Sequence, residues 1–462
     1  MFLPFESKWR NCFYTWEGLS RIPGFLGHGN TRLTIHKNMK GKVRTIIIIG
    51  AGPAGLMAAK KLSKKYKVII LEARDRIGGR IQSVMEPGFS TLVESGAEFI
   101  HGKLPQTFRL LKKAGIGYEK MQGQMYRVGP DGWQIQKEMI PGWYKLLKQM
   151  KKEKRDRTLS DFLEEYYPGE PHRAFRLQVR SYAEGFDLAD TSKVSIHALR
   201  KEWSAEEEEI YRITGGYGQL IRYLEEECHK HGCDIYTDNC VQQIDWEKED
   251  VTVYSTSGKK FSGEKCIITV PLNIFAKVIG PGAINITPPL DEQVTAAKEV
   301  GFGTAIKIAF EFNEPFWKGY AENPGFIISD EPVPVWWVGN SKAPRLLTGW
   351  KGGPGAALLS KCTDDEILQT ALQSLSVIFR IPIIALREKL VASKIFNWLK
   401  QDYSEGAYSH DYPTSEKAKN LLNTSVADTI FFAGEGIFQG ASAGTVEAAL
   451  ASGKQTASKL MK

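Results

Sequence analysis

The chain has 462 residues, of which 42% are hydrophobic and 25% are charged, so it can fill the cores of two or three domains. No apolar run approaches the about 20 residues that cross a bilayer, and the sequence therefore predicts no membrane span. The formal net charge of +8 is modest for this length. Basic residues dominate the first 42 positions and the run from Lys151 to Arg157, but neither stretch has the motif context of a nucleic-acid module. We expect a cytoplasmic protein without a nucleic-acid partner.

The first 42 residues contain aromatic side chains but no continuous apolar region and no small-residue cleavage site, so a secretory signal is not expected. Met39 stands shortly before the first predicted strand. One hypothesis is that residues 1–38 are an upstream extension of the reading frame. We treat residues 1–42 as an N-terminal extension outside the predicted domains.

A dinucleotide-binding unit is predicted between Thr45 and Glu72, in the letters TIIIIGAGPAGLMAAKKLSKKYKVIILE. The β-branched run 46–49 is typical of a parallel strand that is covered on both faces. A helix is expected from Pro53 to Lys64, and a second strand from Lys67 to Leu71. This order of strand, turn, helix and strand is the context in which a glycine-rich turn binds a cofactor.

The glycines of this unit, Gly50, Gly52 and Gly55, form the pattern G-x-G-x-x-G. The first makes the tight turn, the second lets the backbone approach a pyrophosphate, and the third lets the helix pack on the strand. The helix N-terminus favours phosphate, because its N–H groups are unpaired and its dipole attracts negative charge. Glu72 follows at about the 20-residue separation at which a carboxylate accepts hydrogen bonds from a ribose.

Two further motifs stand almost a chain length apart. ARDRIGGR follows Glu72 and ends on Arg80. Near the C-terminus, IFFAGEGIFQGASAGTVEAALASGKQTASKL predicts a buried strand at 429–432 and a helix at 443–460. These motifs resemble the second signature and the closing motif of the flavin-containing amine oxidase family, and the resemblance runs from about Arg44 to the end of the chain. Because both motifs must meet one extended cofactor, it implies FAD.

The resemblance also implies which residues bind FAD. The arginine of the second signature meets the phosphates, and the residue matching Val241 touches the adenine through its backbone. The closing strand meets the diphosphate, while the helix behind it faces the flavin pyrimidine, where reduced flavin carries negative charge. The expected cofactor-binding residues are Gly50, Gly52, Pro53, Ala54, Gly55, Glu72, Ala73, Arg74, Gly79, Arg80, Val241, Gly434, Glu435, Gly444, Thr445 and Val446.

Three other segments resemble the active-site segments of the family. AIKIAFEFNEPFW implies that Lys307 lies near flavin N5, and GAEFIHG puts His101 where several polyamine oxidases carry an active-site histidine. NWLKQDYSEGAYS has the family spacing for Trp398 and Tyr408. Each residue also has a simpler interpretation. The alternating pattern around Lys307 by itself favours a lysine on the solvent face, and the other three would be structural residues of the core.

The chain departs from the monoamine oxidases of this family at two positions. Those enzymes attach their flavin through a cysteine just before a cage tyrosine, but Ala407 stands there in this chain. We therefore expect FAD to bind without a covalent bond. At the position matched to their second cage tyrosine the chain has Ala441, which leaves Tyr408 as one wall and predicts a wider amine pocket.

The six cysteines show no paired framework, and an enzyme of this size does not need one. The segment CHKHGC, from Cys228 to Cys233, has residues that can bind a metal. Its position at the end of a predicted helix, with Gly232 as the C-terminal cap, favours a structural turn instead. We predict no metal site.

The motifs divide the chain into two predicted domains. A Rossmann-like FAD-binding domain is expected from 43–121, 214–272 and 396–462, and a substrate domain from 122–213 and 273–395. In this family such insertions join into a mixed sheet with helices over the flavin, so the predicted fold class is α/β with a mixed-sheet substrate domain. Helical patterns lie at 159–166, 181–186 and 364–379, and Thr363 with Glu366 forms a capping box before the last of them.

Substrate specificity is expected to reside in 122–213 and around Trp336, Trp337 and Trp350. The acidic run from Glu206 to Glu209 is either a solvated surface or a stretch that draws cationic amines toward the site. The sequence does not distinguish monoamines, polyamines and amino acids, because no arginine can be assigned to a substrate carboxylate. It does not indicate an oligomeric state.

The predicted reaction is the oxidation of a small-molecule amine by hydride transfer to FAD, with dioxygen as the acceptor and hydrogen peroxide as a product. Lys307 would assist the oxygen step, while Tyr408 and Trp398 would orient and desolvate the amine. A desaturase-like or protoporphyrinogen-oxidase-like enzyme that acts on carbon-carbon bonds stays open as an alternative, as does a non-catalytic flavoprotein.

Overall fold

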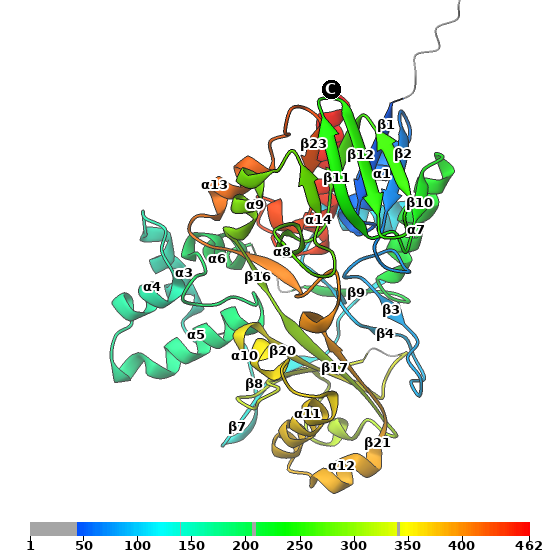
Figure 1. Ribbon diagram of the computed structural model, residues 1–462. Helices are drawn as coiled ribbons and strands as arrows, with labels where there is room; N and C mark the ends of the chain where they lie inside the picture. The colour runs from blue at the N-terminus through cyan, green and yellow to red at the C-terminus, as the bar shows by residue number, and fades with distance from the viewer. Residues whose placement is uncertain (1–43, 139, 206–208, 340–341) are drawn as a thin grey trace, which may run out of the picture. The chain divides into compact units, whose positions relative to one another are not determined.

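The computed structural model describes residues 44–138, 140–205, 209–339 and 342–462 (Figure 1). The predicted N-terminal extension with Met39, and positions 206–208 of the acidic run, lie outside the described residues. Residues 43–462 form one compact unit by their mutual contacts. The limits of the two expected domains therefore stay a prediction.

A parallel five-stranded sheet is built on the strands that flank the glycine motif. Its order is β10-β2-β1-β14-β23, and every neighbouring pair is parallel. The strands are β1 (Thr45–Ile49), β2 (Lys67–Leu71), β10 (Asp234–Tyr236), β14 (Lys265–Ile268) and β23 (Ile430–Phe432). The strands predicted at 46–49, 67–71 and 429–432 are confirmed as β1, β2 and β23.

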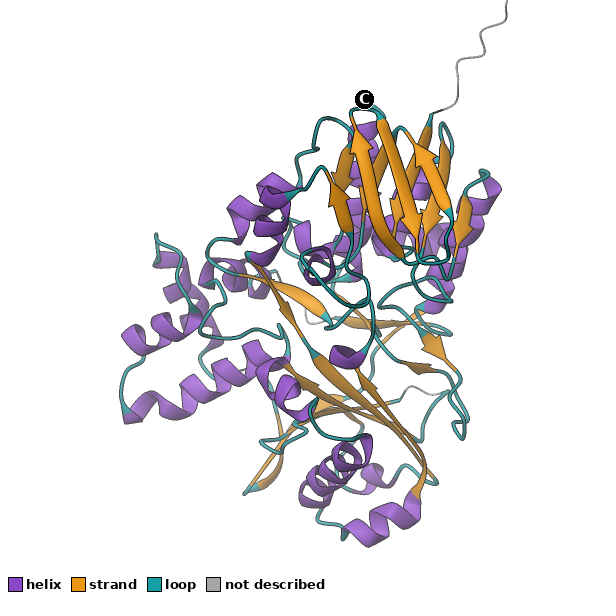
Figure 2. Ribbon diagram, in the orientation of Figure 1, coloured by secondary structure: helices purple, strands orange, loops and turns teal. Residues whose placement is uncertain are grey.

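Helices cover one face of this sheet and a second sheet covers the other (Figures 1 and 2). The helices are α1 (Pro53–Leu62), α2 (Pro105–Ala114), α7 (Gly218–Lys230) and α14 (Val446–Leu460). The second sheet has the order β13-β12-β11-β15, with β11 (Val241–Glu247), β12 (Asp250–Ser255), β13 (Lys260–Gly263) and β15 (Asn285–Thr287). Helices α8 (Leu272–Phe275), α9 (Asp291–Lys298) and α13 (Ser415–Leu422) pack beside it.

This layering explains the run of isoleucines in β1. Ile46 and Ile48 pack into the helical layer, whereas Ile47 and Ile49 pack into the second sheet. Side chains leave a strand alternately on its two faces, so a strand covered on both sides needs apolar residues at every position. Helix α1 ends at Leu62, two residues before the predicted end.

A mixed seven-stranded sheet stands below the parallel one in Figure 1. Its order is β21-β17-β20-β19-β18-β7-β8, and among these pairs only β18 and β7 are parallel. The strands are β7 (Gln124–Gly129), β8 (Gly132–Ile135), β17 (Ala305–Phe312), β18 (Pro324–Ile328), β19 (Val335–Val338), β20 (Leu346–Gly352) and β21 (Leu390–Asn397). Helices α10 (Gly353–Leu359), α11 (Asp364–Phe379) and α12 (Ile383–Lys389) share a core with one face of this sheet. The predicted α/β class with a mixed sheet is confirmed.

A group of helices lies beside the mixed sheet and has its own core around Phe162, Val179 and Trp203. It contains α3 (Trp143–Lys152), α4 (Leu159–Tyr166), α5 (Arg173–Gly185) and α6 (Ile196–Trp203). The helical predictions at 159–166 and 364–379 match α4 and α11, and the pattern at 181–186 overlaps the end of α5. Short strands complete the fold, namely β3 (Ser83–Val84), β4 (Val93–Glu94), β5 (Phe99–His101), β6 (Tyr118–Lys120), β9 (Ile210–Ile213), β16 (Val300–Gly303) and β22 (Tyr408–Asp411).

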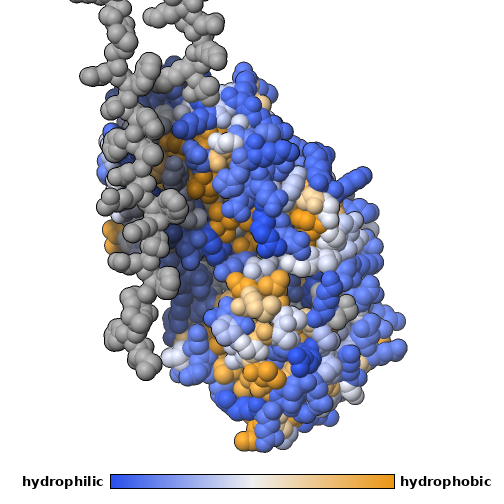
Figure 3. Space-filling view, turned by 90° about the vertical axis from the view of Figure 1, so that its right-hand side faces the viewer, coloured by the Kyte–Doolittle hydropathy of each residue, from blue (hydrophilic) through white to orange (hydrophobic). Residues whose placement is uncertain are grey.

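The face in Figure 3 is mostly hydrophilic, and its hydrophobic residues gather in separate patches, one of them in a recess in the upper half of the view. Within the described residues, no single helix is long and apolar enough to cross a bilayer, and only α11 with α12 meets the length and composition test as a pair bent by 107°. The apolar side of α11, including Ile367 and Leu375, is buried in the core beside the mixed sheet.

The predicted capping box of α11 is present. Thr363 accepts a hydrogen bond from the Glu366 backbone at 3.3 Å, and the Glu366 carboxylate accepts one from the Thr363 backbone at 2.8 Å. We expect Thr363→Ala to lower the free energy of unfolding by about 1 kcal/mol, because a backbone donor loses its partner. Thr363→Ser keeps the oxygen and should cost less than half as much. Equal losses in the two variants, measured by denaturant unfolding, would contradict this assignment.

Candidate active site

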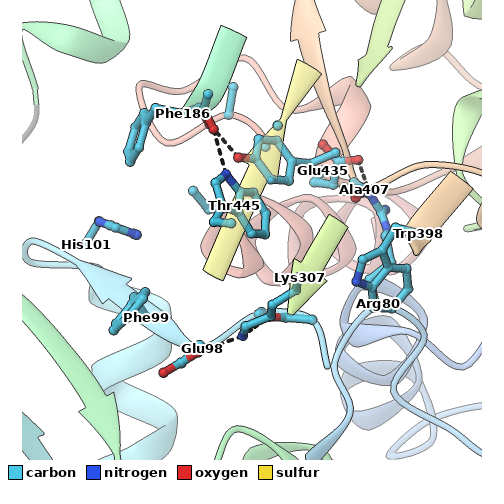
Figure 4. Close-up of a pocket in the computed structure, with 18 of the residues that line it drawn as sticks. Arg80, Glu98, Phe99, His101, Phe186, Lys307, Trp398, Ala407, Glu435 and Thr445 are labelled. Atoms are coloured by element: carbon cyan, nitrogen blue, oxygen red, sulfur yellow. Dashed lines mark hydrogen bonds and ion pairs between the residues drawn. The ribbon is translucent and has the colours of Figure 1, made fainter. Parts of the chain in front are cut away.

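A cavity of about 2100 Å³ is lined by residues of both large sheets and of α3, α5 and α6. Pockets for single small ligands measure about 300 to 1000 Å³, so this cavity has room for an extended cofactor and a second ligand. Every residue that the sequence predicts to bind the cofactor or to act in catalysis lines it, except Gly55. Figure 4 shows the part of the lining around Lys307, Trp398 and Phe186.

The glycine turn has the geometry that a phosphate site requires. Gly50 has a φ of +104°, and its N–H donates to the Leu71 carbonyl at 2.8 Å. Gly52 is the N-cap of α1, and a Cβ added to it would meet nothing within 4 Å, because this position faces the cavity. Gly55 lies behind the turn, where an added Cβ would stand 2.1 Å from the Gly50 carbonyl oxygen. Gly55 therefore shapes the turn without lining the cavity.

Glu72 borders the same end of the cavity and is 5% exposed. Its Oε2 accepts a hydrogen bond from the Ala51 backbone at 2.8 Å, and its Oε1 accepts one from the Arg74 backbone at 3.0 Å. Each carboxylate oxygen keeps a second lone pair. The position thus fits a carboxylate that is held by the turn and can accept from a ribose hydroxyl.

A second helix N-terminus opens on this cavity at α14. Gly444 has a φ of +69°, and the Thr445 side chain caps α14 by accepting from the Ala448 backbone at 3.2 Å. Gly453 of α14 lies against α1, where an added Cβ would stand 2.1 Å from the Ala54 carbonyl oxygen. The N-termini of α1 and α14 therefore meet one ligand space, which fits a dinucleotide with negative charge along its length.

Arg80 joins two segments of the lining. Its Nη1 donates to the Ala407 carbonyl at 2.6 Å and to Glu435 Oε1 at 2.8 Å (Figure 4). The other oxygen of Glu435 accepts from the backbone of Ser409 at 3.3 Å. This network ties the second signature to the closing motif and keeps Ala407, which has no nucleophilic atom, at the wall of the cavity.

Lys307 points inward and is 1% exposed. The pattern-based interpretation of a solvent-facing lysine is wrong, because all eight residues of β17 are buried. One face of β17 packs into the core of α10, α11 and α12. On the other face Lys307 lines the cavity, while Ala309 packs into a separate small core. Alternation marks a solvent face only when one side of a sheet meets water.

A buried ion pair holds the Lys307 ammonium. Nζ lies 2.6 Å from Glu98 Oε2 and donates to the Gly96 carbonyl at 3.2 Å. Glu98 Oε1 accepts from Arg212 Nε and from the Trp337 indole, each at 3.1 Å. Burial by itself would raise the pKa of Glu98, but the charges of Lys307 and Arg212, with hydrogen bonds from Lys307 and Trp337, lower it below its ordinary value.

Sequence reasoning missed Glu98 and Arg212. Each had a signal, because each is a charged residue in an otherwise apolar strand-like segment, GAEFIHG and IYRI. A charged side chain in such a segment needs a partner when it is buried. The partner cannot be named from local sequence, because Glu98, Arg212 and Lys307 come from three distant segments.

Aromatic side chains form the wall next to this pair. The Tyr408 hydroxyl donates to the Phe186 carbonyl, and burial raises the pKa of this phenol well above its ordinary value. The Trp398 indole donates to the Ser95 carbonyl at 2.8 Å. The His101 ring packs edge to face on Phe186 at 5.5 Å. Burial lowers the pKa of His101 to about 4, so the imidazole is neutral at neutral pH.

Two predictions about the pocket wall need correction. Trp336 is fully buried in the core with α11 and does not line the cavity, whereas its neighbour Trp337 does, because adjacent residues of β19 face opposite sides. Ala441 also does not line the cavity. The turn through Gly444 brings Gly444 and Thr445 to the wall beside Tyr408 instead.

The CHKHGC segment is a helix end. Helix α7 ends at Lys230, and Gly232 has a φ of +73°, as predicted for a C-terminal cap. Cys228 and Cys233 are buried, and the Cys228 thiol meets the Leu56 carbonyl at 3.5 Å. Across the described ranges, no group of three or more histidine, cysteine, aspartate or glutamate residues has the geometry of a metal site.

The sequence model of the flavin containing amine oxidoreductases matches residues 53–461. The chain belongs to this family. Lysine-specific histone demethylase 2 of Homo sapiens is 28% identical over 461 residues, which cover 92% of this chain and 54% of that protein. Polyamine oxidase 4 of Oryza sativa subsp. japonica is 24% identical, and the match covers 95% of this chain and 93% of that protein. The chain thus spans about half the length of the demethylase and nearly all of the polyamine oxidase.

Solved structures of two amine oxidases share the fold. A putrescine oxidase bound to putrescine has a TM-score of 0.76 at 19% identity, covering 91% of this chain and 99% of that one. Cyclohexylamine oxidase from Brevibacterium oxydans IH-35A has a TM-score of 0.75 at 18% identity, and the match covers 91% of this chain and 99% of that one. The family carries a flavin, and its cofactor class agrees with the glycine turn and the two helix N-termini of this cavity.

Proposed function

We propose that the protein binds FAD without a covalent bond and oxidises an amine, with dioxygen as the final acceptor. When bound, flavin would take a hydride from the amine carbon and then pass two electrons to dioxygen, which becomes hydrogen peroxide. The observation that carries the proposal is the buried ammonium of Lys307 in the wall of a cavity that two helix N-termini share. Ala407 stands where the monoamine oxidases of this family carry the cysteine that attaches their flavin, and it supports non-covalent binding.

The residues of the proposed amine pocket have separate tasks. The Tyr408 and Trp398 rings exclude water and orient the amine, because hydrogen bonds to the Phe186 and Ser95 carbonyls fix both rings. Neutral His101 can accept a hydrogen bond from a substrate N–H without repelling a cation. Lys307 presents positive charge where negative charge develops during the oxygen step.

Di- and polyamines are the proposed substrate class to test first. Two acidic side chains, Glu184 on α5 and Glu202 on α6, line the cavity, and a carboxylate there suits a second cationic amine. Burial raises the pKa of Glu184 and the charge of Lys351 opposes this; a substrate cation would oppose it further. The polyamine oxidase relative also has nearly the same length as this chain. The desaturase-like alternative is less favoured, because it has little need for a buried lysine.

An anaerobic titration of the visible spectrum tests this function. We expect diamines or polyamines to bleach the flavin at concentrations at which amino acids leave it oxidised. Photoreduction of the same sample serves as the control that the flavin accepts electrons. A yellow protein that light reduces but no amine bleaches would exclude the amine oxidase and favour an enzyme acting on carbon-carbon bonds.

A further inference from the structure

The Lys307 ammonium needs a constant counter-charge, because the cavity wall removes it from water. A buried ammonium without a partner loses its proton readily, since burial disfavours the charged form. Glu98, at 2.6 Å, is the carboxylate in direct contact with it. Its charge is secure, because the pKa of Glu98 lies below its ordinary value.

Glu94 is the other carboxylate that Lys307 affects, and it is less suited to this task. Its Oε1 accepts hydrogen bonds from the Tyr217 backbone at 2.7 Å and from Ser83 Oγ at 2.8 Å, so it holds the turn before α7. Burial raises the pKa of Glu94 to about 6. Its negative charge therefore changes within the range in which an enzyme works, whereas that of Glu98 does not.

The carboxylate of Glu98 is itself fixed from two further elements. Arg212 on β9 reaches Oε1 through Nε and Nη2, the second at 3.0 Å, and its guanidinium also donates to the Val338 carbonyl at 3.0 Å. The Trp337 indole on β19 holds the same oxygen. Oε2 is left to Lys307, so rotation of the carboxylate would break several hydrogen bonds at once.

We propose that Glu98 is a positioning residue of the active site, which keeps the Lys307 ammonium charged and aimed at the cavity through a carboxylate anchored by Arg212 and Trp337. The ionised groups at and around this ion pair are Lys307, Glu98, Arg212 and, above about pH 6, Glu94. The ion pair is independent of the substrate, but its role in the oxygen step rests on the function proposed above.

The titration of Lys307 itself tests this role without catalysis. In full-length protein with carbon-13 labelled lysine, Lys307→Arg identifies the resonance of Lys307. We expect the midpoint of its titration to lie about 1 to 3 pH units lower in Glu98→Gln than in the unsubstituted protein. The rate at which dioxygen reoxidises photoreduced flavin should shift its pH profile in the same direction and by a similar amount.

Two variants serve as comparisons. Glu311→Gln removes a carboxylate that is 2% exposed on the same strand as Lys307 and is paired with Arg345 at 2.9 Å. Glu311→Gln should lower the stability of the protein and leave the midpoint of the Lys307 titration unchanged. Glu98→Asp keeps the charge and should show a smaller shift than Glu98→Gln. Glu98→Ala also removes the charge, and it replaces Glu98→Gln if that variant does not fold.

An unchanged Lys307 midpoint in folded Glu98→Gln, or in Glu98→Ala if that is the variant that folds, would overturn the proposal. An equal shift in Glu311→Gln would overturn it too, because the effect would then be a general one. Failure of every amine to reduce the flavin would refute the proposed function instead, since neither the lysine titration nor photoreduction involves an amine.

Discussion

Lys307→Met is expected to slow the reoxidation of reduced flavin by dioxygen by about 100-fold or more. The ammonium lies in a wall that excludes water, where it stabilises negative charge far better than it would in solvent. Methionine has a similar length and fills the space without a charge. Reduction by the amine should change much less, because the aromatic wall is untouched. Rapid mixing of photoreduced protein with dioxygen measures reoxidation separately from reduction by the amine.

Two lysine variants make this result specific. Lys307→Arg keeps a positive charge and should lose less of the rate than Lys307→Met. Lys419→Met removes another lysine that is 1% exposed and is paired with Asp411 at 2.5 Å, away from the cavity lining. It should lower stability, as loss of a buried partner does, and leave reoxidation unchanged. A Lys307→Met protein that reoxidised at the unsubstituted rate would remove the proposed role of this lysine.

Alanine at Gly55 and at Gly52 should damage cofactor binding in two different ways. A Cβ at Gly55 would overlap the Gly50 carbonyl oxygen at 2.1 Å. We therefore expect Gly55→Ala to lower the stability of flavin-free protein by about 1 to 3 kcal/mol and to abolish flavin retention. A Cβ at Gly52 meets no protein atom, and the φ of −73° there suits alanine. Gly52→Ala should leave flavin-free stability unchanged and weaken flavin binding at least about tenfold.

The comparison needs thermal unfolding of flavin-free protein and a fluorescence titration with FAD. Alanine is favoured over glycine inside a helix, so a loss of stability in Gly55→Ala would come from the overlap and not from helix propensity. Gly453→Ala is a second variant that creates a backbone overlap, since an added Cβ there would stand 2.1 Å from the Ala54 carbonyl oxygen. Tight FAD binding by Gly52→Ala would contradict the assignment of this glycine to the pyrophosphate.

Local sequence predicted the elements whose cause is local. The isoleucine run of β1, the glycine turn and the capping box of α11 follow from side-chain shape, φ angles and hydrogen bonds within a few residues. Patterning also located β17 and the helices at 159–166 and 364–379. It failed at the faces of strands, where it favoured a solvent-facing Lys307 and did not separate Trp336 from Trp337.

The glycine turn has a steric cause within a few residues and indicates a dinucleotide cofactor, and its combination with the closing motif carried the resemblance to the family. The resemblance already implied that Lys307 lies near the flavin, but the tertiary structure was needed to show that Glu98 and Arg212 accompany it. These three side chains come from β17, from the segment before β5 and from β9, so their meeting depends on how the sheets pack. Burial then forces the charges to pair, because a charge removed from water without a partner is too costly to keep.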